Sequence, residues 1–235
     1  MKLHILGTAS GLPELNKHHS AVMINYENKN ILIDAGEGIS QQLLKYNYDK
    51  NYIDDIIITH FHPDHVSGVF LLLQMLYLQG RKKELRIFIP EKCDVFLNTV
   101  ELFYLFPKKF KFKLSVLPIV QLAKFHPEII IIANAHLEKY KNIPHQIHHS
   151  YENYSIYLET KKKILYTSDI PDFSSLQDYW SKTDLIILDA LHPDSKDIKK
   201  HICETNARVI LNHGVPKEFK NEKFEKADET KPIIF

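Results

Sequence analysis

The chain has 235 residues, of which 44% are apolar and 25% are charged, so it can bury a core and lacks the charge excess of a disordered chain. Its formal net charge is +1, and only three of its basic residues are arginines, Arg81, Arg86 and Arg208. This balance excludes a global attraction to nucleic acid or to an anionic membrane, and it disfavours a surface of guanidinium–phosphate contacts.

Short apolar runs alternate with helical patterns along the chain. The first half is expected to hold strands at 3–6, 21–26, 31–34 and 56–59, and helices at 39–46 and 66–78. The second half is expected to hold strands at 85–89, 129–133, 154–158, 164–166, 185–188 and 209–211, and helices at 91–106 and 194–204. Strands first and interspersed helices later favour helix-covered sheets of the α/β class, in a single domain over 1–235.

The cysteines and the two ends of the chain indicate the compartment in which the protein is expected. Residues 215–235 are rich in charge and are expected to form a C-terminal helix or frayed tail. Cys93 and Cys203 are too far apart in sequence for a zinc-finger spacing and too few for a disulfide framework. The first residues lack the apolar region of a signal peptide, and the run 69–78 is too short to span a bilayer. We therefore expect a cytoplasmic protein without a membrane partner.

Glycine is scarce and histidine abundant: the chain has 7 glycines, where average usage would give roughly 16, and 14 histidines. Four metal-ligand residues fall within six positions, His60, His62, Asp64 and His65, between a predicted strand and a predicted helix. Alternate residues of an extended segment point to one side, so His60 and His62 can share one ion while Asp64 and His65 face a second. A nitrogen and oxygen ligand set without thiolate favours Zn²⁺ first, then Mn²⁺ or Fe²⁺.

Three positions downstream can supply the ligands that this motif lacks. His149 precedes the predicted strand at 154–158, Asp169 follows the strand at 164–166, and His213 follows the strand at 209–211. Strand-end loops are where a rigid scaffold presents ligands. The sequence therefore predicts a centre of two divalent metal ions.

Together these residues resemble the pattern of the metallo-β-lactamase superfamily, from residue 1 to about 214. The resemblance implies a four-layered αβ/βα sandwich with a dinuclear site. It implies that one ion is bound by His60, His62 and His149, that the other is bound by Asp64, His65 and His213, and that Asp169 bridges them. It also implies that Asp34, with Thr59, lies behind the ligands and orients them.

The choice of His149 depends on spacing within the family motif, where the ligand precedes a tyrosine by five residues, as His149 precedes Tyr154. His148 is the first alternative, and His145 and His136 rank below it.

The N-terminal half is most similar to the ribonuclease Z branch of phosphodiesterases. Residues 7–13 read GTASGLP, like that branch's glycine-rich first loop, and residues 34–38 read DAGEG, where the branch has Asp-Cys-Gly-Glu-Gly. Backbone amides at Gly7, Ser10 and Gly11 would suit a phosphate oxygen, although tight turns alone would also select glycine.

Two departures separate the chain from that branch. Asp169 follows His149 by only 20 positions, which leaves no room for the branch's tRNA-binding arm, and LDAL at 188–191 replaces its His-Glu-Ala-Thr motif.

The resulting expectation is a phosphodiesterase that uses a metal-bridging hydroxide. Asp64 is expected to accept a proton and His192 to protonate the leaving group, with His18 and His19 as alternatives. The expected partner is a phosphodiester or another small molecule, RNA is disfavoured by the charge, and the aromatic segment 91–113 offers surface for a homodimer. The alternatives are hydrolysis of a thioester, lactone or β-lactam, true tRNA 3′ processing, and a non-hydrolytic redox or metal-carrying binding module.

Overall fold

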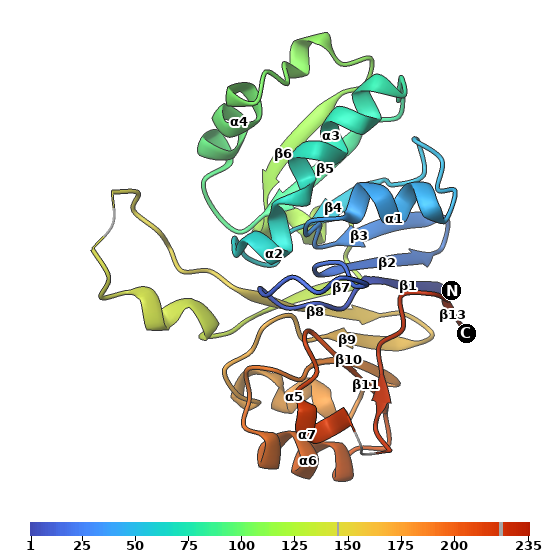
Figure 1. Ribbon diagram of the computed structural model, residues 1–235, viewed down its shortest axis with the longest axis vertical. Coiled ribbons are helices and arrows are strands. Elements are labelled where there is room, and N and C mark those ends of the chain that lie inside the picture. Colours follow the sequence, from blue (N-terminus) through green and yellow to red (C-terminus); the bar gives the residue numbers. More distant parts are fainter. Residues whose placement is uncertain (145, 221–222) are drawn as a thin grey trace. The chain divides into compact units, whose positions relative to one another are not determined.

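The computed structural model describes residues 1–144, 146–220 and 223–235 (Figure 1). The chain forms two compact units, one of residues 1–121 with 228–235 and the other of residues 122–227. Each unit is built on its own sheet.

The first unit contains a seven-stranded sheet with the order β13-β1-β2-β3-β4-β5-β6. Its strands are β1 (Lys2–Gly7), β2 (Ala21–Tyr26), β3 (Lys29–Ile33), β4 (Asp55–Ile57), β5 (Leu85–Ile89), β6 (Leu114–Pro118) and β13 (Ile233–Ile234). Strands β1 to β3 form an antiparallel meander, and β3 to β6 are parallel. Its helices are α1 (Ile39–Lys45), α2 (Pro63–Val66), α3 (Gly68–Leu78), α4 (Cys93–Leu102) and η1 (Pro107–Lys109), and η2 (Ile119–Lys124) contains the boundary between the units.

The core of the first unit lies between its sheet and the helices α1 and α3, which lie side by side (Figure 1). Helix α3 buries Val69, Leu72, Leu73 and Leu76, which recur at helical spacing. Strand β4 is buried along its whole length, as is usual for a parallel strand covered on both faces. The segment that follows β4 is therefore anchored to a tightly packed strand.

The second unit contains a six-stranded sheet with the order β12-β11-β10-β9-β8-β7. Its strands are β7 (Ile129–Ala133), β8 (Tyr154–Glu159), β9 (Lys163–Tyr166), β10 (Leu185–Asp189), β11 (Arg208–Asn212) and β12 (Glu225–Lys226). Strands β7 to β9 are antiparallel and β9 to β12 are parallel. Its helices are η3 (His136–Tyr140), η4 (Ser174–Leu176), α5 (Gln177–Trp180), α6 (Ser195–Cys203) and α7 (Lys217–Lys220).

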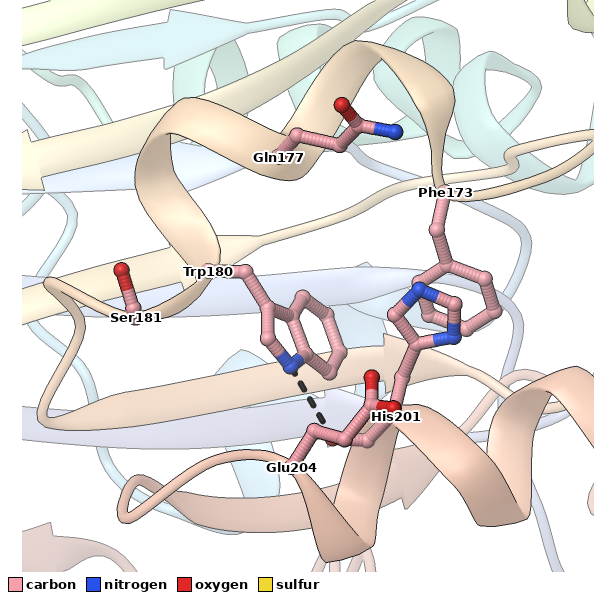
Figure 2. A pocket seen from close by; sticks show the side chains of 6 residues that line it. All are labelled: Phe173, Gln177, Trp180, Ser181, His201 and Glu204. Atoms are coloured by element: carbon pink, nitrogen blue, oxygen red, sulfur yellow. Dashed lines mark hydrogen bonds between the residues drawn. The ribbon is translucent and has the colours of Figure 1, made fainter.

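A hollow of about 310 Å³ lies between α5 and α6 (Figure 2). Part of its wall is aromatic: the His201 ring stacks on Phe173 with 3.9 Å between centroids, and Trp180 Nε1 donates a hydrogen bond of 3.0 Å to the His201 carbonyl. Both Phe173 and Trp180 are buried. These contacts make His201 a packing residue of the second unit.

The strands and helices expected between residues 3 and 211 are all present, and the predicted α/β class is confirmed. Strand β6 was not expected, because it is a half-buried edge strand that ends in proline. The helix expected over 66–78 begins earlier, with Pro63 in the first turn of α2, and is divided before Gly68. A Cβ at Gly68 would lie 2.1 Å from the Gly36 carbonyl oxygen, so only glycine allows this close packing.

The charged C-terminal segment differs from the helix or frayed tail that we expected. Among its described residues, only the four of α7 are helical, and β12 then pairs in parallel with β11 and β13 pairs antiparallel with β1. Glu229, between these two strands, is only 8% exposed. Backbone pairing and a buried carboxylate hold this segment in spite of its charge. No helix of the described residues has the length and apolar composition needed to cross a membrane.

Arg81 is a buried cation that closes the turn after α3. Its guanidinium donates four hydrogen bonds of 2.6–2.8 Å to the carbonyl oxygens of Lys50, Ile53, Lys83 and Glu84. We expect Arg81→Met to lower the free energy of unfolding by about 3 kcal/mol, because these acceptors lose a charged donor. Urea unfolding followed by circular dichroism measures this change.

The matched control is Arg208→Met, which removes an exposed guanidinium paired with Glu225 and should cost about 1 kcal/mol or less. Equal losses in the two variants would contradict the structural role of Arg81.

Candidate metal centre

In the first unit, four potential ligands follow the buried strand β4. His60 and His62 lie in the extended segment after the strand, and His62 is the residue before helix α2. Asp64 and His65 lie on that short helix. His60 and His65 are fully buried, and Asp64 is 8% exposed.

Asp34 holds two parts of this ligand set in place. It follows β3 and is fully buried. Its carboxylate accepts hydrogen bonds from the Thr59 amide at 2.8 Å and the Thr59 hydroxyl at 2.9 Å, and it lies 2.8 Å from Nδ1 of His65. Since a carboxylate accepts, His65 carries its proton on Nδ1, which leaves Nε2 as the basic nitrogen. Metal-binding histidines are commonly oriented in this way.

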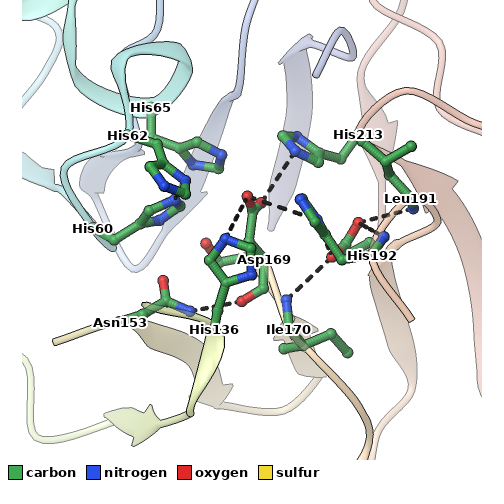
Figure 3. A network of polar contacts seen from close by, with 12 residues as sticks. His60, His62, His65, His136, Asn153, Asp169, Ile170, Leu191, His192 and His213 are labelled. Atoms are coloured by element: carbon green, nitrogen blue, oxygen red, sulfur yellow. Dashed lines mark hydrogen bonds and ion pairs between the residues drawn. The ribbon is translucent and has the colours of Figure 1, made fainter. Parts of the chain in front are cut away.

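The same chain of contacts orients His60. Its Nδ1 lies 3.1 Å from the Thr59 hydroxyl oxygen, whose hydrogen is already donated to Asp34. His60 therefore donates from Nδ1 and presents a basic Nε2, which lies 3.0 Å from Nδ1 of His62. Figure 3 shows the rings of His60, His62 and His65 gathered together. Converging basic nitrogens are the arrangement that a divalent cation requires.

In the second unit, Asp169 is surrounded by imidazoles (Figure 3). Its carboxylate oxygens lie 3.3 Å from Nε2 of His213, 3.6 Å from Nε2 of His136 and 3.8 Å from Nδ1 of His192. Asp169, His192 and His213 offer ligand atoms within 4.8 Å of one another. Asp169 is 1% exposed, so an ionised carboxylate here needs such cationic or metal neighbours.

Asn153 fixes the positions of both Asp169 and His136. Its buried side-chain amide donates to the Asp169 carbonyl and to Oδ1 of Asn134, both at 2.6 Å. That Oδ1 also accepts from the His136 amide at 3.0 Å. The Asn134–Asn153 pair therefore holds the start of η3, and with it His136, close to Asp169.

His192 forms a dyad with Asp189 at the end of β10. His192 Nδ1 lies 2.9 Å from Oδ2 of Asp189, and this carboxylate also accepts from the amides of Ile170 at 3.1 Å and Leu191 at 2.9 Å. The His192 proton on Nδ1 is thus held by a fixed carboxylate, and the ring is partly exposed. Such a dyad sets the tautomer and the orientation of a proton-transferring histidine.

Strained backbone accompanies the two ligand sets. Asp34, Ser168 and His213 have positive φ angles of 57°, 52° and 61°. Non-glycine residues in this region cost about 1–3 kcal/mol each and cluster at functional sites. Here they allow the chain to turn sharply at the ends of β3, β9 and β11 and to present the side chains.

The expectation that His149 supplies the third histidine ligand stays a prediction, and the structure offers a second candidate. His149 is half-buried beside Tyr151, with 6.2 Å between ring centroids, and it belongs to none of the ligand groups formed by the described residues. His148 is exposed, and His145 lies outside the described residues. His136, the remaining alternative, is 2% exposed and lies beside Asp169. It follows β7 by three positions, so the strand-end rule that selected the other ligands also points to it.

The predicted substrate loop has two different parts. Gly7 is buried at the end of β1, and a Cβ there would lie 1.7 Å from the His19 carbonyl oxygen, so its glycine is needed for backbone packing. Gly11 is exposed beside Asp64, whose Oδ2 would lie 3.7 Å from an added Cβ, and Ser10 is half-buried. Of the expected contacts, Ser10 and Gly11 are thus accessible, whereas Gly7 is not.

Comparison with known proteins places the chain in a family. The family described as "Anti-Pycsar protein Apyc1" matches residues 1–204. The ribonuclease Z of Methanococcus aeolicus is 31% identical over 164 residues, which are 69% of this chain and 48% of that protein. The ribonuclease Z of Methanocaldococcus jannaschii is 38% identical over 103 residues, 43% of this chain and 32% of that protein. The matches thus span less than half the length of these relatives.

Solved structures share the fold over the full chain. Human tRNase Z, short form, has a TM-score of 0.69 at 21% identity and covers 100% of this chain and 99% of its own. The metallo-beta-lactamase fold protein YhfI from Bacillus subtilis has a TM-score of 0.70 at 18% identity, with 99% and 98% covered. The predicted metallo-β-lactamase fold is thereby confirmed. The chain therefore belongs to the Anti-Pycsar protein Apyc1 family and has the metallo-β-lactamase fold.

Proposed function

We propose that this chain is a metal-dependent phosphodiesterase. The observation that carries the proposal is the orientation of buried ligands by fixed partners, with Asp34 behind His60 and His65, and Asn153 behind Asp169 and His136. A packing role alone does not require basic ring nitrogens held in one tautomer. The names of the ribonuclease Z relatives and the similarity of the first loop to theirs add support for phosphodiester chemistry.

Each unit has its own set of proposed ligands. The first supplies His60, His62, Asp64 and His65, and the second supplies His136, Asp169 and His213. This set replaces His149 of the sequence prediction by His136. Imidazole and carboxylate donors without thiolate fit two divalent ions, with Zn²⁺ favoured over Mn²⁺ and Fe²⁺.

Different residues of the chain would serve different steps of hydrolysis. Bound divalent ions would lower the pKa of a water toward neutrality and offset negative charge on a phosphate oxygen. Asp64 would accept a proton. His192, held by Asp189 through Nδ1, would give the proton on Nε2 to the departing oxygen.

The choice between a small phosphodiester and RNA depends on charge and on the segment before β8. With His136 as the ligand, 33 positions separate it from Asp169, rather than the 20 counted from His149. Within that interval, residues 141–144 and 146–153 lie outside helices and strands (Figure 1). This longer interval leaves more room for a substrate-binding arm, and the near-zero net charge is the main support for a small substrate.

A substrate panel tests the proposal on metal-loaded protein. We expect two divalent ions per chain by elemental analysis, and turnover of bis(p-nitrophenyl) phosphate and of 3′,5′-cyclic nucleotides. Thioesters and lactones should remain intact. Turnover of only the carbonyl substrates would contradict phosphodiester chemistry. Preferential cleavage of precursor tRNA would favour the processing endonuclease. One ion or none per chain would contradict the dinuclear centre.

A further inference from the structure

Glu229 is a buried acid that the family match does not include, since that match ends at residue 204. It lies in the C-terminal segment 228–235, which belongs to the first unit. There it meets the two ends of the first loop, at Thr8 and His18, and helix α1 at Gln42.

The carboxylate has five polar contacts. Oε1 accepts from the Thr8 amide at 2.9 Å, the Thr8 hydroxyl at 2.8 Å and the His18 amide at 3.1 Å. Oε2 accepts from Nε2 of Gln42 at 2.8 Å and lies 2.7 Å from Nδ1 of His18. Gln42 is itself fixed, because the same nitrogen donates to the Leu6 carbonyl at 2.8 Å.

The backbone of Glu229 is held as firmly as its side chain. Its carbonyl accepts from the Tyr46 hydroxyl at 2.6 Å and lies 3.1 Å from Nε2 of His4. Burial lowers the pKa of His4, so the ring is neutral near pH 7, with Nε2 donating to the carbonyl. Nδ1 then accepts from the Tyr48 hydroxyl at 3.0 Å, and burial raises the pKa of Tyr48 to about 12, which keeps that hydroxyl protonated.

These contacts close the base of the first loop, whose tip lies by a proposed ligand. The amides of Thr8 and Ala9 both donate to the His18 carbonyl at 2.9 Å. At the tip, Gly11 lies next to Asp64. A buried carboxylate costs more than an apolar side chain of similar size would, so stability alone does not favour one here. A carboxylate surrounded by fixed donors instead selects one conformation.

We propose that Glu229 is a positioning residue: its carboxylate locks the base of the first loop and thereby sets Ser10 and Gly11 for substrate binding beside Asp64. As far as it concerns turnover, this inference rests on the proposed phosphodiesterase function. Glu229 acts through the loop and touches neither the reacting atoms nor the ligands.

The test compares Glu229→Ala and Glu229→Gln with Asp228→Asn, which alters the adjacent exposed carboxylate. In Glu229→Ala, hydrogen exchange at the His18 amide, which donates to Glu229, should accelerate at least about tenfold. KM for bis(p-nitrophenyl) phosphate should rise about tenfold, with kcat within about twofold of wild type and metal content unchanged. Glu229→Gln, which keeps one acceptor oxygen, should restore part of both effects, and Asp228→Asn should match wild type.

Wild-type exchange and KM in Glu229→Ala, or equal changes in Asp228→Asn, would overturn the inference. A lower melting temperature with an unchanged KM would overturn it as well, because it would assign Glu229 to stability alone. Should Glu229→Ala fail to fold, Glu229→Gln carries the same test with a smaller effect. Absence of turnover in the wild-type chain would refute the proposed function instead, and amide exchange would still decide whether Glu229 holds the loop.

Discussion

Asp169→Ala is expected to remove at least one metal ion per chain and to lower kcat/KM for bis(p-nitrophenyl) phosphate by about a thousandfold. The reason is the position of this carboxylate among the imidazoles of His136, His192 and His213, at 3.3–3.8 Å. Elemental analysis and steady-state kinetics measure the two effects. The control is Asp172→Ala, an exposed acid three positions downstream that accepts a hydrogen bond from the Ser174 amide.

The same two measurements decide which histidine completes the centre. His136→Ala should behave like Asp169→Ala, because His136 is buried beside this acid. His149→Ala should retain both ions and near wild-type turnover. The reverse pattern would restore the assignment from sequence spacing, and full activity with two ions in Asp169→Ala would contradict the whole ligand set.

Local patterns were enough to predict the elements, and they point to the proposed ligands that follow directly from those elements. The block from His60 to His65 follows a buried apolar strand, and Asp169 and His213 each follow a strand of the second unit. In these places the residue type, the alternation of side chains and the position in the strand point to the same site. The structure adds the contacts that orient them, such as Asp34 with Thr59 and His65.

The strand-end rule alone could not choose between His136 and His149, because the deciding contacts are made by irregular segments. His136 is directed to Asp169 by the pairing of Asn134 with Asn153, which the spacing of histidines does not reveal. The contacts of Glu229 are harder still to predict, because its partners Thr8 and His18 lie more than 200 positions earlier in the chain. A charged C-terminal segment has the composition of a solvated tail, and only its tertiary contacts show that one acid in it is buried.

Asp189 and His192 are a third case, in which residues at a motif that differs from the family pattern form a hydrogen-bonded pair of their own. The sequence lacks the histidine and threonine of the His-Glu-Ala-Thr motif, but it has an aspartate with a histidine three positions later. In the structure, the Asp189 carboxylate lies 2.9 Å from His192 Nδ1 and accepts hydrogen bonds from the backbone amides of Ile170, Leu191 and His192. A fixed carboxylate and a partly exposed imidazole are the components needed to protonate a leaving group.

His192→Ala is therefore expected to discriminate between substrates by their leaving groups. A 3′,5′-cyclic nucleotide releases an alkoxide, which needs a proton, so kcat should fall by about 10²–10⁴-fold. Bis(p-nitrophenyl) phosphate releases a stabilised phenolate, and its kcat should fall by less than about tenfold. Asp189→Asn should reproduce the pattern more weakly, since an amide no longer holds the Nδ1 proton as a carboxylate does.

His201→Ala is the control for this experiment, because His201 packs on Phe173 in the same unit and should leave both substrates unaffected at a temperature where the variant is folded. The ratio of the two kcat values is the informative quantity, because loss of a metal ion or of folded protein lowers both rates together. An equal loss for both substrates, with a reduced metal content, would make His192 a metal ligand, a role that its position 3.8 Å from Asp169 also allows. An unchanged ratio with full metal content would remove His192 from the proton transfer.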